Sequence, residues 1–128
     1  MADYRILVTG SRDWQDFARV SFELGLVIGE AYRDGYGKES IVVVHGACPT
    51  GADAMAHEIC RDYGWREETH PAAWHLQGSA AGPLRNKKMV GLGANVSLAF
   101  IRNCSRGASG CADLAEKAGI ETRRFAAT

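Results

Sequence analysis

Residue types that bind phosphate recur in two short stretches of this sequence. The first stretch, Thr9-Gly10-Ser11-Arg12, offers two hydroxyl groups and a guanidinium, and the second, Ser105-Arg106-Gly107-Ala108-Ser109, repeats the same chemistry. Glycine lets a ligand approach the backbone amides closely, and the N–H groups at a helix start attract phosphate oxygens. The glycines could instead serve only to make tight turns. Two matched stretches favour phosphate binding over that explanation.

A third stretch, from His45 onward, combines turn-forming residues with an acidic side chain. Gly46, Pro49 and Gly51 lie between an apolar run and a helical pattern, and Asp53 falls in the first turn of the expected helix. As a carboxylate at a helix start, Asp53 either stabilises the helix dipole, accepts hydrogen bonds from a ribose hydroxyl or orients a water. His45 is equally compatible with a buried, hydrogen-bonded histidine and with an acid or base. Asp53 is therefore the candidate catalytic residue.

Arg85 and Asn86 lie at the start of a further expected helix, where a cation opposes the helix dipole. A phosphate or carboxylate ligand would compensate for this, and so would an intramolecular partner such as Asp53 or Asp13. Trp74 could stack on a base or cover the site, although an aromatic side chain under a long loop more often anchors the core. The sequence leaves the partner of Arg85 open.

Alternating strands and helices must position these residues. Apolar residues recur with helical spacing in some segments, and form short β-branched runs in others. One stretch, residues 71–82, has neither pattern and is expected to be a long irregular loop or lid. The expected strands span residues 4–9, 41–44, 66–70, 96–101 and 120–125, and the expected helices residues 17–31, 52–63, 84–90 and 110–118.

This alternation predicts an α/β fold with a doubly wound, mainly parallel sheet of about five strands and helices on both faces. Right-handed crossovers give an expected strand order near 3-2-1-4-5. In such sheets, ligands bind beyond the carboxyl ends of the strands, where the strand order reverses. The loops 10–14, 45–51, 71–82 and 102–109 are therefore expected to form the ligand site.

Length and composition limit the classes of protein that this chain can be. Its 128 residues suit a single domain, residues 1–128, and 15 basic residues balance 15 acidic ones. Zero net charge counts against a dedicated nucleic-acid binder, and no apolar run is long enough to span a membrane. We therefore expect a cytoplasmic protein that binds a small molecule and neither nucleic acid nor a membrane.

The four cysteines include no Cys-x-x-Cys pair and are expected to be free thiols. Cys48, Cys104 and Cys111 fall in or just after loops on one side of the expected fold, which leaves a metal site open. Zinc ligands usually have tighter spacing than these residues. We therefore expect no metal and no cofactor.

Several blocks of sequence also recur, in this order, in a known family. The blocks are Val8-Thr9-Gly10-Ser11-Arg12-Asp13-Trp14, His45-Gly46 followed by Gly51-Ala52-Asp53 and Ala56, Pro71-Ala72-x-Trp74, Ala81-Gly82-Pro83-Leu84-Arg85-Asn86-x-x-Met89, and Ala99-Phe100 with Arg106-Gly107. With these blocks the chain resembles the YspA, cpYpsA-related branch of the SLOG superfamily over nearly its whole length. It is also similar to proteins of unknown function from bacteria and their phages.

The resemblance implies a Rossmann-like fold that binds nucleotides or nucleotide-derived ligands. Relatives elsewhere in the superfamily include cytokinin-activating phosphoribohydrolases, the DNA-processing protein DprA and sensor domains for ADP-ribose-like ligands. Relatives also pair through helices, so a homo-oligomer stays open, although burial in the core explains the apolar stripe of the first helix equally well. Fold alone does not choose among these activities.

One departure from the phosphoribohydrolases bears on that choice. They carry Gly-Gly-x-Gly-Thr-x-x-Glu, with a catalytic glutamate, where this chain has Ser105 at the second glycine, Ala108 at the threonine and Cys111 at the glutamate. The missing carboxylate disfavours glycosidic hydrolysis by that mechanism, unless Asp53 serves instead.

The leading hypothesis is a protein that binds a nucleoside phosphate or an NAD- or ADP-ribose-like ligand as a sensor, sequestering or processing factor. Arg12, Arg85 and Arg106 are expected on phosphate, and Asp53 on ribose. The alternatives are hydrolysis of a nucleotide N-glycosidic or phosphate bond, and single-stranded nucleic-acid binding as in DprA. Whether the chain is an enzyme stays open. The expected ligand-binding residues are Thr9, Gly10, Ser11, Arg12, His45, Gly46, Gly51, Asp53, Arg85, Asn86, Ser105, Arg106, Gly107 and Ser109.

Overall fold

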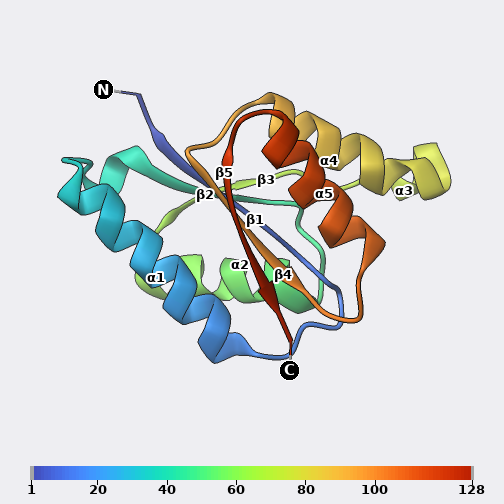
Figure 1. Ribbon diagram of the computed structural model, residues 1–128, viewed down its shortest axis with the longest axis horizontal. Helices are drawn as coiled ribbons and strands as arrows, with labels where there is room; N and C mark the ends of the chain where they lie inside the picture. Colours follow the sequence, from blue (N-terminus) through green and yellow to red (C-terminus); the bar gives the residue numbers. More distant parts are fainter. Residues whose placement is uncertain (1, 128) are drawn as a thin grey trace.

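The computed structural model describes residues 2–127, which contain one five-stranded sheet (Figure 1). Every pair of neighbouring strands is parallel, and the strand order is β3-β2-β1-β4-β5. The expected doubly wound sheet and its strand order are thus confirmed. The strands are β1 (Tyr4–Gly10), β2 (Ile41–His45), β3 (Arg66–Thr69), β4 (Val96–Ile101) and β5 (Glu121–Ala126).

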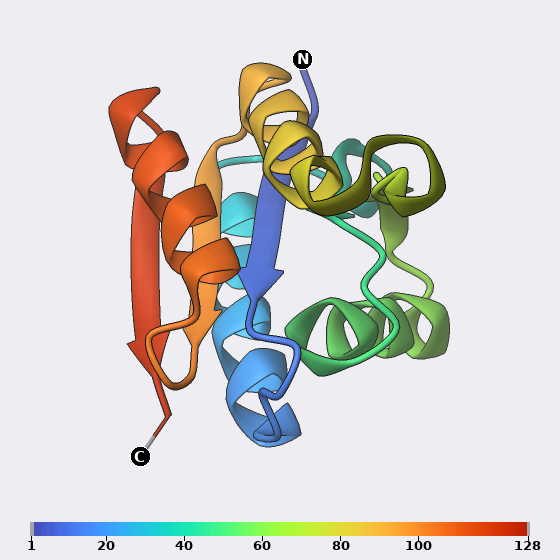
Figure 2. The ribbon, with the colours of Figure 1, turned by 90° about the vertical axis from the view of Figure 1, so that its right-hand side faces the viewer.

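Helices cover both faces of the sheet, as expected (Figure 2). The first two helices pack on one face and the last two on the other. None of the helices in the described part of the chain combines the length and the apolar character that crossing a membrane requires. The helices are α1 (Phe17–Arg33), α2 (Gly51–Tyr63), α3 (Trp74–Gln77), α4 (Ala81–Gly91) and α5 (Arg106–Lys117), with short 3-10 turns η1 (Lys38–Ser40) and η2 (Gly78–Ala80).

The central strand β1 supplies side chains to a core on each face. Ile6 and Val8 pack with α1 and α2, whereas Leu7 packs with α4 and α5. This division follows from the pleat of a strand, which points successive side chains to opposite faces. All of β2 is buried, because helices cover both of its faces, and this explains its uninterrupted apolar run.

Two helices begin earlier than the sequence indicates. Helix α5 starts at Arg106 rather than at Gly110, because Ala108 and Cys111 are buried and their packing outweighs the low helix propensity of nearby glycines. Helix α4 starts at Ala81, so that Pro83 lies in its first turn, where the missing N–H is tolerated. The stretch 71–82 also contains α3 and η2. The prediction of a long irregular loop there was therefore wrong.

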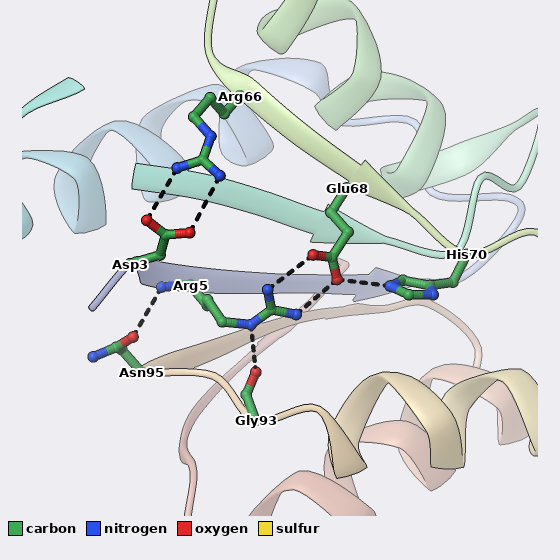
Figure 3. A network of polar contacts seen from close by, with 7 residues as sticks. All are labelled: Asp3, Arg5, Arg66, Glu68, His70, Gly93 and Asn95. Carbon is green, nitrogen blue, oxygen red and sulfur yellow. Dashed lines mark hydrogen bonds and ion pairs between the residues drawn. The ribbon is translucent and has the colours of Figure 1, made fainter. Parts of the chain in front are cut away.

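The edge strand β3 is fixed to β1 by a polar network (Figure 3). Arg5 reaches across β2 and donates to both carboxylate oxygens of Glu68, at 2.9 and 2.7 Å, while its Nε donates to the Gly93 carbonyl oxygen at 2.8 Å. His70 lies 2.7 Å from the same carboxylate. The hydrogen bonds from Arg5, and then from His70, lower the pKa of Glu68 to about 2 although partial burial opposes them. The network holds the carboxyl end of β3, next to the site described below.

Candidate ligand-binding site

A cavity of about 730 Å³ opens at the carboxyl edge of the sheet, where the strand order reverses between β1 and β4, and it extends between α4 and α5. This is the position that a doubly wound sheet predicts. The residues singled out from the sequence divide into two groups. Those that line the cavity are Thr9, Gly10, Arg12, Asp53, Arg85, Asn86, Ser105, Arg106 and Gly107, and those that do not are Ser11, His45, Gly46, Gly51 and Ser109.

The start of α5 faces this cavity without a cap. Its N-cap residue, Ser105, makes no side-chain capping hydrogen bond, and the first turn holds no acidic residue. Ser105, Arg106, Gly107 and Ala108 all line the cavity. An uncapped helix start presents backbone N–H groups and a partial positive charge, and the exposed Arg106 guanidinium adds to that charge. This end of the cavity can therefore bind a phosphate.

Arg85 and Asn86 connect the loops around the cavity to one another. Arg85 Nη1 donates to the Gly46 carbonyl oxygen and, at 3.3 Å, to that of His70, while its Nε donates to Asn86 Oδ1 at 2.7 Å. Asn86 Nδ2 in turn lies 3.4 Å from the Gly107 carbonyl oxygen. The hydrogen-bond partners of Arg85 are thus backbone carbonyls and Asn86 rather than the carboxylates considered for it, although its charge also acts on Asp53 and partly opposes the rise that burial causes in the pKa of that carboxyl. The pair ties the end of β2 to the starts of α4 and α5.

The glycines after β2 accommodate other parts of the protein. A Cβ on Gly46 would overlap the Arg85 guanidinium, and a Cβ on Gly51 would overlap the Ser11 carbonyl oxygen. Gly51 also has a φ of 72°, which side-chain-bearing residues rarely adopt. Protein atoms therefore occupy the space that a side chain would take at these two positions.

The two predicted serines outside the cavity serve local structure. Ser11 Oγ accepts a hydrogen bond from the Arg102 backbone N–H at 2.8 Å and so joins the loop after β1 to the loop after β4. Ser109 is the fourth residue of α5, and its backbone N–H donates to the Ser105 carbonyl oxygen at 3.0 Å. Both residues shape the cavity edge without facing it.

Asp53 is a buried carboxylate that lines the cavity, with 6% of its surface exposed. Burial raises the pKa of Asp53, while His45 and the backbone N–H of Cys48 partly oppose that rise. The Cys48 N–H donates to Asp53 Oδ2 at 3.3 Å, so the carboxylate supports the loop before α2. Its position in the lining also leaves it within the candidate site.

His45 belongs to a separate polar cluster behind this loop. It is 2% exposed, its Nε2 contacts Glu67, and Glu67 also lies 2.8 Å from His57 Nδ1. Burial raises the pKa of Glu67, but hydrogen bonds from His45 and His57 outweigh burial and the net change is downward. Among residues 2–127, these three side chains bring metal-ligand atoms within 4.8 Å of one another, whereas the cysteines considered from the sequence join no such group.

The hydrogen bonds of His45 bear on whether that cluster suits a metal ion. The backbone N–H of Ala47 donates to His45 Nδ1 at 3.0 Å, so a neutral ring carries its proton on Nε2 and donates it to Glu67. A metal ion would have to displace that proton, and a metal-bound histidine ordinarily donates from its other ring nitrogen. The cluster therefore fits a hydrogen-bonded chain of side chains better than a metal centre.

Trp74 and Arg12 form one rim of the cavity. Trp74 is 45% exposed, so it does not anchor the core, and the Arg12 guanidinium lies over its ring at 5.0 Å from the centroid. The far edge of the ring faces Gly82, where a Cβ would lie 3.0 Å away. The side chain lines the cavity, where stacking on a base or covering the site stays a prediction.

The part of the cavity between α4 and α5 was missed in the sequence. Met89 of α4 and Gly110 and Leu114 of α5 line it. Gly107, Gly110 and Leu114 follow one flank of a helix at i, i+3 and i+7, a signal that becomes visible once α5 begins at Arg106. The further lining residues are Asp13, Cys48, Trp74, Gly82, Pro83 and Ala108.

An all-parallel, doubly wound sheet with a cavity at its reversal point defines a Rossmann-like α/β protein. The family model for the YspA, cpYpsA-related SLOG family matches residues 4–76. The chain is also 41% identical, over 128 aligned positions, to the Gene 61 protein of Mycobacterium phage D29, with 94% of this chain and 95% of that protein covered. The chain therefore belongs to the YspA, cpYpsA-related SLOG family. No solved structure matches it.

Proposed function

We propose that the protein binds a nucleotide or a nucleotide-derived ligand, such as a nucleoside phosphate, NAD or ADP-ribose, in the 730 Å³ cavity. The observation that carries this proposal is the uncapped start of α5, with Arg106 beside it, in the cavity wall. Such a helix start binds phosphate through its N–H groups. Family membership supports the proposal, because SLOG proteins are often associated with nucleotide-related ligands.

The role that suits such binding is that of a sensor, a sequestering protein or a processing factor in the cytoplasm. All four cysteines are free, as suits a reducing compartment. Cys111 of α5, which takes the place of the catalytic glutamate of the phosphoribohydrolases, is fully buried. Burial raises the pKa of its thiol, so it offers no substitute for that carboxylate at neutral pH. These features favour binding over hydrolysis.

Thermal denaturation with AMP, ADP, NAD and ADP-ribose tests the proposal. A ligand at about 100 times its Kd stabilises a folded protein by about 2.7 kcal/mol, which raises the Tm by several degrees. Arg106→Ala should reduce the rise, whereas Arg61→Ala, which removes an exposed arginine of α2 outside the cavity, should not. Absence of any shift with all four nucleotides would contradict the proposal.

Asp53 supports a second candidate function, hydrolysis of a nucleotide N-glycosidic or phosphate bond. A buried carboxylate with a raised pKa that lines a cavity is typical of a catalytic group. Chromatography of AMP or ADP-ribose incubated with the protein would show release of base or phosphate. Loss of turnover in Asp53→Asn with unchanged nucleotide affinity would support hydrolysis, and intact nucleotides with the wild-type protein would exclude it for these substrates.

A further inference from the structure

The cavity continues beyond its phosphate-binding end into a slot between α4 and α5. Asn86 and Met89 supply the α4 side, and Gly107, Gly110 and Leu114 supply the α5 side. Figure 2 shows the two helices side by side on the same face of the sheet, and α3 next to α4. The slot therefore begins next to the uncapped start of α5 and follows that helix to Leu114.

The glycines of α5 keep this slot open. A Cβ on Gly107 or on Gly110 would meet no atom within 4 Å, so close packing inside the protein does not require glycine at either position. Gly10, at the end of β1, is the opposite case, because a Cβ there would overlap Ala52. Glycine is disfavoured within a helix, yet two of them line the cavity one turn apart. The absent side chains leave a cradle on the flank of α5 that lines the cavity.

The walls of the slot suit an apolar, flat group. The half-buried Leu114 presents hydrocarbon surface, the almost fully buried Met89 closes the wall from the α4 side, and the glycines expose backbone that a planar ring can approach closely. Asn86, the polar side chain in this wall, already bonds to Arg85 and to Gly107. A second phosphate or a sugar would therefore meet few partners in the slot.

The rim of the cavity at Trp74 and Arg12 suits a flat apolar group less well than the slot does. Arg12 already lies over the Trp74 ring, and the opposite edge of that ring faces Gly82. A base stacking on Trp74 would compete with Arg12 for the ring face. In the described part of the chain, by contrast, no atom lies within 4 Å of a Cβ built on Gly107 or Gly110 in the slot.

We propose that the α4–α5 slot binds the nucleobase of the ligand while its phosphate lies at the start of α5. This inference rests on the proposed function and goes beyond it by assigning the base to Gly107, Gly110, Met89 and Leu114. The ligand class is then a nucleotide whose planar base contributes affinity, rather than a sugar phosphate alone.

Isothermal titration of AMP and of ribose 5-phosphate, which lacks the base, tests the assignment. The wild-type protein is expected to bind AMP about tenfold or more tightly than ribose 5-phosphate, because burial of a base adds apolar contact. Gly110→Leu fills the slot and should lower AMP affinity about tenfold, while ribose 5-phosphate affinity stays within about twofold. Gly29→Leu is the matched control, since Gly29 is a helix glycine with open surroundings outside the cavity.

The possible outcomes separate this inference from the proposed function. Unchanged AMP affinity in Gly110→Leu, an equal loss for both ligands, or selective loss of AMP in Trp74→Ala instead would overturn the slot assignment and leave nucleotide binding intact. Failure of the wild-type protein to bind either ligand would overturn the slot assignment, and it would overturn the proposed function as well if ADP, NAD and ADP-ribose also fail to stabilise the protein. If Gly110→Leu does not fold, as judged by circular dichroism, Gly110→Ala takes its place and should still weaken AMP selectively.

Discussion

Glycines lie in two regions in or near the cavity wall, and their surroundings differ. After β1 and β2, Gly10, Gly46 and Gly51 are glycine because protein atoms come too close for a side chain. At the start of α5, Gly107 and Gly110 have nothing within 4 Å of a built Cβ, and both line the cavity. Glycine therefore permits close packing of the protein in the first region and leaves free space in the second. The glycines that leave free space, Gly107 and Gly110, indicate a binding site.

This difference changes how the Gly-rich stretches are to be interpreted. The loop after β2 is a structural junction, because Arg85 and Asn86 connect it to α4 and α5. The start of α5 lacks a side-chain cap and has no acidic residue in its first turn. Its backbone N–H groups and the positive end of its dipole are therefore available to a ligand.

Gly51→Ala should have the largest effect on stability. The change forces a side chain onto a left-handed backbone and against the Ser11 carbonyl oxygen, so we expect a loss of about 3 kcal/mol in the free energy of unfolding. Urea denaturation monitored by circular dichroism measures this loss. A change below about 0.5 kcal/mol would show that the loop after β2 is not closed in the way described.

Arg85→Met should cost about 2 kcal/mol of stability, because it leaves the carbonyl oxygens of Gly46 and His70 without their donor. Arg106→Met is the matched control in the open region. Arg106 is exposed, and its replacement should change stability by less than about 0.5 kcal/mol. Equal losses in the two variants, measured by urea denaturation, would erase the distinction between the two regions.

Glu68→Gln should change the acid dependence of stability. The folded-state pKa of Glu68, about 2, lies below its ordinary value of 4.5, so the carboxylate stabilises the fold above about pH 4.5 and loses this effect as the pH falls toward 2. The side chain is 34% exposed, and solvent screening limits the effect to about 1 kcal/mol.

Unfolding free energies at pH 7 and at pH 3 check the Glu68 prediction. The variant should be less stable than the wild-type protein at pH 7, and the gap should narrow at pH 3. A gap of the same size at both pH values would indicate that the charge of Glu68 does not contribute.

Gly110→Ala should have the smallest effect and the opposite sign. Alanine is a better helix former, and its methyl group meets open space, so the free protein should gain about 0.5–1 kcal/mol in stability. Gly29→Ala in α1, where a built Cβ also meets nothing within 4 Å, should gain a similar amount. A loss of stability confined to Gly110→Ala would show that the flank of α5 is already packed.

Periodicity in the sequence was enough to predict the strand order and the edge position of β3. The alternation of short apolar strands and amphipathic helices admits few topologies, and Gly64 ends α2 with a φ of 71°, as its position suggests. The start of α5 could not be predicted in the same way. Its first turn has weak helix propensity and forms because Ala108 is buried, which is a tertiary effect.

The candidate site was predicted in part for a related reason. Residue type indicates what a side chain can bind, and the loops with Thr9, Arg12 and Arg106 do reach the cavity. The sequence does not show which of these residues already bond to, or pack against, other parts of the protein. Arg85 is bonded to backbone carbonyls, and the space at Gly51 is filled by the loop after β1. Only the three-dimensional structure distinguishes these residues, which already contact protein atoms, from Gly107 and Gly110 of α5, which face free space.

A crystal structure of the protein with AMP tests the central claim most directly. The account predicts phosphate oxygens within hydrogen-bonding distance of the backbone N–H groups of Gly107 and Ala108, with the adenine between α4 and α5 beside Gly110. Phosphate at the start of α2, or crystals grown in saturating AMP with the cavity free of nucleotide, would contradict it.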